Sequence, residues 1–99
     1  MPRFIALFRD PVDPTAVAAE ISAAHFAYLD QCRNNVLLAG GLRADLGQPF
    51  CGALWIIEAA DRAAAERLVE DDPYRQHAIW SAPEIFAWGK APSYGKVEI

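Results

Sequence analysis

FCGALWIIEA, residues 50–59, is the stretch that decides the fold of this 99-residue chain. Both of its alternating sets of side chains are apolar, with Trp55 and Ile57 on one side and Leu54 and Ile56 on the other. A strand with this pattern is covered on both faces, because each set needs apolar surroundings. We therefore expect residues 50–59 to form a strand buried from both sides.

Three further segments, on either side of this strand, also have strand patterns. Arg3–Arg9 is again apolar in both alternating sets, and Val36–Leu42 contains the glycine pair Gly40-Gly41. Ile79–Trp88 is expected to be the last strand. Pro83 lies within it and has no N–H to donate to a neighbouring strand, so we place this strand at an edge of the sheet.

A first helix is expected from Pro14 to about Arg33, with Asp13 as its N-cap. Proline suits the first helical position, because the N–H that it lacks would have no partner there. Apolar and aromatic residues then recur at steps of three and four and form one amphipathic stripe, which includes Val17, Ile21, His25, Tyr28 and Cys32.

A second helix is expected from Arg62 to about Glu70, with Asp61 as its N-cap. It ends at Asp71-Asp72-Pro73-Tyr74, because the residue before a proline is disfavoured in the helical conformation. Apolar side chains at helical spacing place one face of this helix against the protein interior.

The resulting order is β-α-β-β-α-β, which is the ferredoxin-like arrangement of an α+β protein with a four-stranded antiparallel sheet. Two helices cover only one face of such a sheet. The strands are apolar on the other face as well, where we expect Trp55 or its neighbours and residues of the first strand. A monomer would expose a large apolar patch, so we expect a homodimer packed through the sheet faces.

Composition limits the classes of function. With 54% hydrophobic and 22% charged residues, the chain is globular, and we expect one domain over residues 1–99, with a core at about 3–88 and a tail at 89–99. A net charge of −4 without a basic cluster argues against nucleic acid or an anionic membrane surface as a partner. Two cysteines without a paired motif, and no signal or membrane-spanning segment, make a reduced, cytoplasmic protein the expectation.

His25 is the most interesting single residue, and three interpretations of it are open. It can be a core histidine bonded to a backbone carbonyl, or a general acid or base oriented by a carboxylate. It can also be a metal ligand, but the other histidine, His77, has no ligand spacing to it, so we expect no metal. Asp72 is the candidate carboxylate; the residue pattern does not separate it from Asp71, and either can simply be a solvated acid in a turn.

Other candidate groups are less specific. Arg9 is a candidate contact for an anionic ligand group, although arginines at strand ends often face only solvent. Gly40 lies in a glycine pair that permits close approach of backbone or ligand. The aromatic residues suit a core or an interface, since no basic residues alternate with them as in nucleic-acid-binding surfaces.

Four short segments together resemble the YciI-like, or YCII-related, family of small dimeric α+β proteins. They are Phe4-Ile5-Ala6-Leu7, His25-Phe26-Ala27-Tyr28-Leu29, Leu38-Ala39-Gly40 and Asp72-Pro73-Tyr74, in this order, and the likeness extends from about Arg3 to Trp88. The resemblance implies a dimeric α/β barrel and a catalytic histidine and aspartate at His25 and Asp72, with Tyr74 beside the substrate. It implies no cofactor. The activity best understood in the family is dehydrochlorination of a hydroxylated chloroaromatic ring.

The sequence differs from the family pattern at the expected rim of the pocket. Gly41 stands where a proline is usual, and His77-Ala78 stands where Ala-Gly is usual. We therefore expect a small lyase or isomerase that moves a proton on an aromatic or lactone-like substrate. The alternative is a non-catalytic dimeric module that binds a small molecule or assists a pathway, and a haem-degrading or oxygen-using barrel ranks last.

Overall fold

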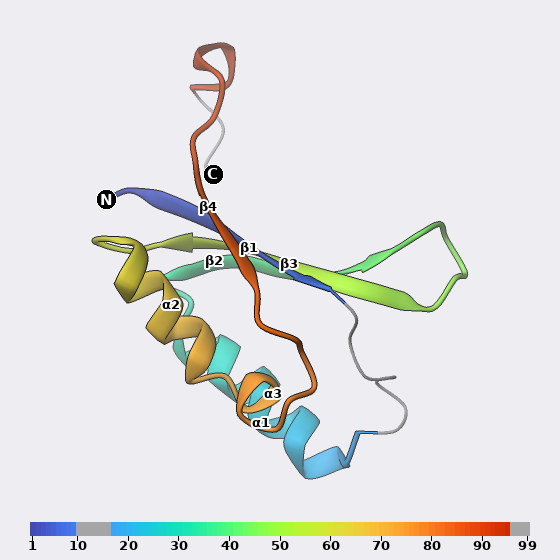
Figure 1. The fold of residues 1–99 in the computed structure, drawn as a ribbon. Coiled ribbons are helices and arrows are strands. Elements are labelled where there is room, and N and C mark those ends of the chain that lie inside the picture. The colour runs from blue at the N-terminus through green and yellow to red at the C-terminus, as the bar shows by residue number, and fades with distance from the viewer. Residues whose placement is uncertain (10–16, 96–99) are drawn as a thin grey trace.

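A single antiparallel sheet in the strand order β2-β3-β1-β4 forms the centre of the computed structural model, which describes residues 1–9 and 17–95. The chain runs through β1 Arg3–Arg9, α1 Ala19–Gln31, β2 Val36–Arg43, β3 Phe50–Glu58, α2 Arg62–Glu70, α3 Pro73–Gln76, β4 Glu84–Trp88 and the 3₁₀ turn η2 Pro92–Tyr94. Figure 1 shows α1, α2 and α3 on one side of the sheet. The predicted α+β class and the predicted four-stranded sheet are confirmed.

The helices bury one alternating set of strand side chains. Phe4, Ala6 and Phe8 of β1 are buried on this side, and so are Trp55 and Ile57 of β3. Of the two alternatives left open for the other face, Trp55 or its neighbours, the structure shows the neighbours, since Trp55 lies on the helix side and only 1% of it is exposed. Both sets of β3 are apolar, so the pattern could not tell which one meets the helices.

The opposite face of the sheet is apolar but uncovered in this chain, and we call it the open face. Across the strands, Ile5 pairs with Ile56 and with Phe86, and Leu7 pairs with Leu54. Four of these side chains are partly buried by one another, while Phe86 is 50% exposed. This is the apolar patch that the sequence predicted, formed by the neighbours of Trp55 and by the first strand.

The prediction for α2 is confirmed at both ends and at its cap. The carboxylate of Asp61 accepts a hydrogen bond from the Ala64 amide at 2.8 Å, which satisfies one of the free amides of the first turn. Ala65 and Val69 are buried against the sheet.

The two cysteines, Cys32 and Cys51, are free thiols, as expected.

The first helix begins later than predicted. Ala18 has an extended backbone (φ −58°, ψ 139°) and its carbonyl accepts from the Ile21 and Ser22 amides, so α1 begins at Ala19. Val17 belongs to the apolar stripe because it packs on the core, although it is not helical. The predicted cap at Asp13 and start at Pro14 lie outside the described residues.

The last strand also begins later than predicted, at Glu84 instead of Ile79. The unpredicted helix α3 ends at a turn in which Ala78 has a φ of 56° and the amides of Ala78 and Ile79 bond to Arg75 O and Tyr74 O. Ile79 and Trp80 are apolar because they pack inward from this turn and not because they form a strand. The strand does lie at a sheet edge, as Pro83 indicated.

Within the described residues, no helix has the length and apolarity needed to cross a membrane.

Candidate active site

His25 lies on the side of α1 that faces the sheet and the α2–α3 corner, and only 5% of it is exposed. It belongs to the same stripe as Ile21 and Tyr28, which pack against the core from the turns before and after it. The helix therefore holds a polar imidazole at an apolar interface, where it needs a hydrogen-bond partner.

Asp72 supplies that partner. The His25 Nδ1 atom lies 2.7 Å from Asp72 Oδ1, and the aspartate is fully buried. Asp72 is the N-cap of α3, where its Oδ1 also accepts from the Tyr74 amide at 3.3 Å and Pro73 occupies the first helical position. Asp71, which the sequence could not separate from Asp72, is the exposed C-cap of α2 and points to solvent instead.

The direction of the hydrogen bond sets the tautomer of His25. Because the carboxylate oxygen accepts, Nδ1 carries the proton and donates it, which leaves Nε2 of a neutral ring with a free lone pair. Nε2 makes no hydrogen bond to any residue that the structure describes. The pair is therefore arranged to present a proton acceptor, or after protonation a proton donor, at Nε2.

Tyr74 lies flat against the imidazole. The two ring centroids are 3.8 Å apart and the planes differ by 3°, while the Tyr74 hydroxyl shares a 2.8 Å hydrogen bond with Ser22 Oγ. Ser22 is one turn before His25 on α1, so the same helix anchors both the imidazole and the ring stacked on it. The stack keeps the imidazole in one plane, and an aromatic face also favours a positively charged neighbour.

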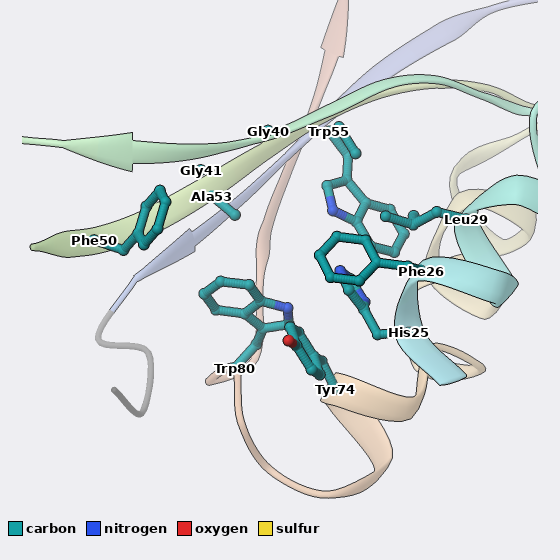
Figure 2. Close-up of a pocket in the computed structure, with 11 residues that line it drawn as sticks. His25, Phe26, Leu29, Gly40, Gly41, Phe50, Ala53, Trp55, Tyr74 and Trp80 are labelled. Atoms are coloured by element: carbon teal, nitrogen blue, oxygen red, sulfur yellow. The ribbon is translucent and has the colours of Figure 1, made fainter. Parts of the chain in front are cut away.

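A cavity of about 240 Å³ opens beside His25, between α1, the sheet and the segment from Tyr74 to Trp80. Figure 2 shows the rings of Phe26, Phe50, Trp55, Tyr74 and Trp80 around it. The remaining lining residues are small or aliphatic: Leu29, Ala39, Gly40, Gly41 and Ala53. The cavity thus suits a flat, mostly apolar small molecule that meets a few polar atoms.

Gly41 explains why Phe50 can form part of the cavity wall. A Cβ atom at position 41 would lie 2.4 Å from the Phe50 ring, which crosses β2 at this point. The Arg43 guanidinium stacks on the same ring, with 4.2 Å between its carbon and the ring centroid. Gly41 stands where the related family often has proline, and here it makes space for an aromatic wall.

The structure brings together four of the five residues proposed from the sequence. His25, Tyr74 and Gly40 line the cavity, and Asp72 lies directly behind His25. Arg9 does not line it: its side chain is largely exposed and bonds to Glu84 at 2.6 Å, so its role as a ligand contact stays a prediction. We also expected the loop around Gly40 to Gln48 to close part of the pocket, and of these residues Gly40 and Gly41 line the cavity.

Sequence reasoning missed four lining aromatic residues: Phe26, Phe50, Trp55 and Trp80. Phe26 is 63% exposed beside His25, an unusual position for a phenylalanine, but exposure cannot be read from the sequence. The sequence predicts a strand at Trp80, because a short apolar segment has the same pattern in a strand and in a buried turn. Among the described residues, no group of three or more His, Cys, Asp or Glu side chains is placed to hold a metal ion.

Comparisons with known proteins agree with this fold. The family model of the YCII-related domain matches residues 3–89, which confirms the resemblance found in the sequence. The chain is also similar to the structure of 5-chloro-2-hydroxyhydroquinone dehydrochlorinase from Burkholderia phenoliruptrix in complex with 2,5-dihydroxybenzoquinone. That match has a TM-score of 0.74 and 22% sequence identity, covers 91% of this chain and 97% of the other, and shows a shared fold. Among proteins with curated descriptions, none matches the sequence.

Proposed function

This chain belongs to the YCII-related domain family, and from that premise we propose that it is a lyase or isomerase that moves a proton on a small aromatic or lactone-like substrate without a cofactor. The substrate occupies the aromatic cavity, and His25 is the group that exchanges the proton. Asp72 is the positioning residue that holds His25.

The observation that carries this proposal is the 2.7 Å contact between His25 Nδ1 and Asp72 Oδ1, with the rest of the imidazole at the cavity wall. A buried carboxylate behind a histidine does two things for proton transfer: it keeps the proton on Nδ1 and it stabilises the imidazolium formed when Nε2 takes a second proton. A histidine bonded only to a backbone carbonyl would gain the first effect but much less of the second.

The proposed reaction follows from these roles. Nε2 accepts a proton from the substrate, and the electron pair of the broken bond remains on the substrate. In a lyase, this pair expels a leaving group together with the leaving group's own bonding electrons; in an isomerase, the imidazolium returns the proton at another atom. The apolar lining excludes water and so strengthens the electrostatic stabilisation of the charged intermediate.

The test is a turnover screen of lactones and halogenated hydroxyaromatic compounds with three variants. We expect His25→Ala to lower the rate by roughly 10²–10⁴-fold, the usual contribution of a general acid or base. Asp72→Asn should lower it by less, because the amide still accepts from Nδ1 without stabilising a positive charge. His77→Ala is the matched control, because His77 is exposed and does not line the cavity, and it should leave turnover unchanged.

Full activity in His25→Ala would rule out this mechanism. Saturable binding of the same compounds without turnover in the wild type would instead identify a non-catalytic binding module.

We also propose that the protein works as a homodimer that packs open face to open face, giving the dimeric α/β barrel. The support is the apolar open face, because soluble monomers rarely expose a contiguous patch of this kind. Sedimentation equilibrium should give a dimer for wild type and a monomer for Phe86→Glu. Leu46→Glu is the control: Leu46 is 92% exposed but lies in the β2–β3 turn, away from the sheet face. A monomeric wild type at micromolar concentration would contradict the proposal.

A further inference from the structure

The indole nitrogen of Trp80 is a buried donor without an acceptor. Two buried side-chain atoms in the described part of the chain lack a hydrogen-bond partner, Trp80 Nε1 and Asp72 Oδ2. Trp80 as a whole is 7% exposed and lines the same cavity as His25. In Figure 2 its nitrogen lies on the side of the indole that is turned towards Tyr74 and His25.

The unpartnered N–H of Trp80 is not explained by packing alone, because an apolar ring could fill the same space without burying a donor. Buried indole N–H groups normally find an acceptor, because withdrawing the donor from water otherwise costs free energy. Trp55 offers a comparison within the same cavity: its nitrogen has no hydrogen bond to a described residue either, but it is not among the atoms withdrawn from solvent. The Trp80 nitrogen is thus the indole donor of this cavity that is both buried and without a partner among the described residues.

The indole of Trp80 is held in place from several sides. Its ring packs against Phe8, with centroids 5.5 Å apart, and against Tyr74, at 5.7 Å. Its carbonyl accepts from Arg75 Nη1 at 3.4 Å, and the next residue, Ser81, bonds through its hydroxyl to Arg9 O at 2.7 Å. The N–H is thus a donor with a defined direction and little freedom to turn towards another partner.

We propose that the Trp80 indole N–H donates a hydrogen bond to an oxygen of the ligand bound in this cavity. The ligand is then a small ring that bears a hydroxyl, phenolate or carbonyl oxygen, and Trp80 sets how that ring lies relative to His25. The Tyr74 hydroxyl is already bonded to Ser22, so among the side chains that line the cavity, His25 and the two tryptophans, Trp55 and Trp80, carry the remaining polar groups. The proposal rests on the proposed function only in using the same cavity as the ligand site.

The test compares phenol with toluene, which have nearly the same shape but differ in the oxygen. The chain has three tryptophans, so a ¹⁵N-labelled sample gives three indole N–H signals, assigned through Trp→Phe variants. We expect phenol to move the Trp80 signal downfield in the wild type, and toluene to bind without that shift. Trp80→Phe, which keeps a ring in place of the indole, should weaken phenol binding roughly three- to tenfold, the usual worth of one net hydrogen bond.

Trp80→Phe should leave toluene binding nearly unchanged, and Trp88→Phe is the matched control because Trp88 does not line the cavity. Equal weakening of phenol and toluene would show that Trp80 acts only by packing and would overturn the proposal. So would a Trp80 signal that phenol does not move, the result expected if the N–H only faces the Tyr74 ring, or an absence of saturable binding by phenol. The wild-type spectra answer the question even if Trp80→Phe fails to fold. Loss of turnover in His25→Ala has no bearing on any of these outcomes.

Discussion

The two faces of the sheet are similar in sequence and different in what they do. On the helix-covered face, apolar strand residues such as Phe8 and Trp55 meet helices that also carry a buried polar pair, His25 and Asp72. On the open face, Ile5 and Phe86 lie opposite each other on neighbouring strands, and no helix of the described chain covers them. Apolar side chains on both faces of the strands thus line an internal cavity on one side, and on the other side they form the surface that we propose binds a second copy.

The largest expected difference between the faces is in stability. Phe8 is fully buried and contacts the rings of Trp55 and Trp80, so Phe8→Ala should cost about 3–5 kcal/mol of unfolding free energy. Phe86→Ala on the open face should cost less, and its cost should grow with protein concentration, because it acts through the dimer. Urea unfolding at several concentrations measures both. An equal, concentration-independent loss in Phe86→Ala would mean that this chain itself covers the open face.

A smaller effect is expected within the helix-covered face at Tyr28. Its hydroxyl donates to the Leu68 carbonyl at 2.5 Å, so Tyr28→Phe should cost about 1 kcal/mol. Burial raises the pKa of Tyr28 well above its usual value of 10, helped by its contact with Cys32 and by the nearby Asp71 and Asp72 carboxylates.

The sign of the pH effect follows from that direction. The folded state keeps the phenol protonated where the unfolded chain ionises, so this contribution is complete below pH 10 and is lost as the pH rises further. Wild type should therefore lose stability above pH 10 more steeply than Tyr28→Phe. Parallel stability curves for the two proteins at alkaline pH would show that Tyr28 ionises as freely in the fold as in solution.

The smallest expected effect is a gain, at the turn that carries Trp80 into the cavity. Ala78 is the one non-glycine residue with a positive φ among the described residues, and it holds the position where a glycine usually ends a helix. Ala78→Gly should raise the unfolding free energy by about 0.5–1 kcal/mol, because a left-handed backbone disfavours a Cβ atom. Ala82→Gly, without a positive φ, should give no gain. A loss of stability in Ala78→Gly would mean that the turn is not strained.

Much of this architecture could be predicted from local patterns. The strands β1 and β3 follow from segments that are apolar in both alternating sets, β2 was predicted over Val36–Leu42, and α2 follows from the Asp61 cap and the Asp72-Pro73 break. The features that the sequence left open or predicted wrongly depend on contacts distant in the chain. The inward side of Trp55 depends on where the helices pack, and the apolar pair Ile79-Trp80 has the same pattern in a strand and in a buried turn.

The site was predictable in part for the same reason. The sequence indicated that His25 lies on an inward stripe and that Asp72 lies at a helix end, but 47 positions separate them and only the fold brings them to 2.7 Å. The short helix α3 has only four residues, so the sequence shows no periodic pattern that would predict it. Its start turns Asp72 inward and leaves Asp71 exposed. The unpartnered nitrogen of Trp80 could only be found in three dimensions.

The most direct test of the central claim is an NMR comparison of the His25 ring in wild type and in Asp72→Asn, with His77 as the reference in the same spectra. If the Asp72 carboxylate accepts the hydrogen bond from His25 Nδ1, the wild type should show a slowly exchanging, strongly downfield Nδ1–H signal from His25. The reason is that a hydrogen bond to a charged acceptor is short and strong. That signal should move upfield or vanish in Asp72→Asn, while His77 stays unchanged. An identical His25 signal in both proteins would contradict the account, since the Asp72 carboxylate would then neither orient the imidazole nor stabilise its positive charge.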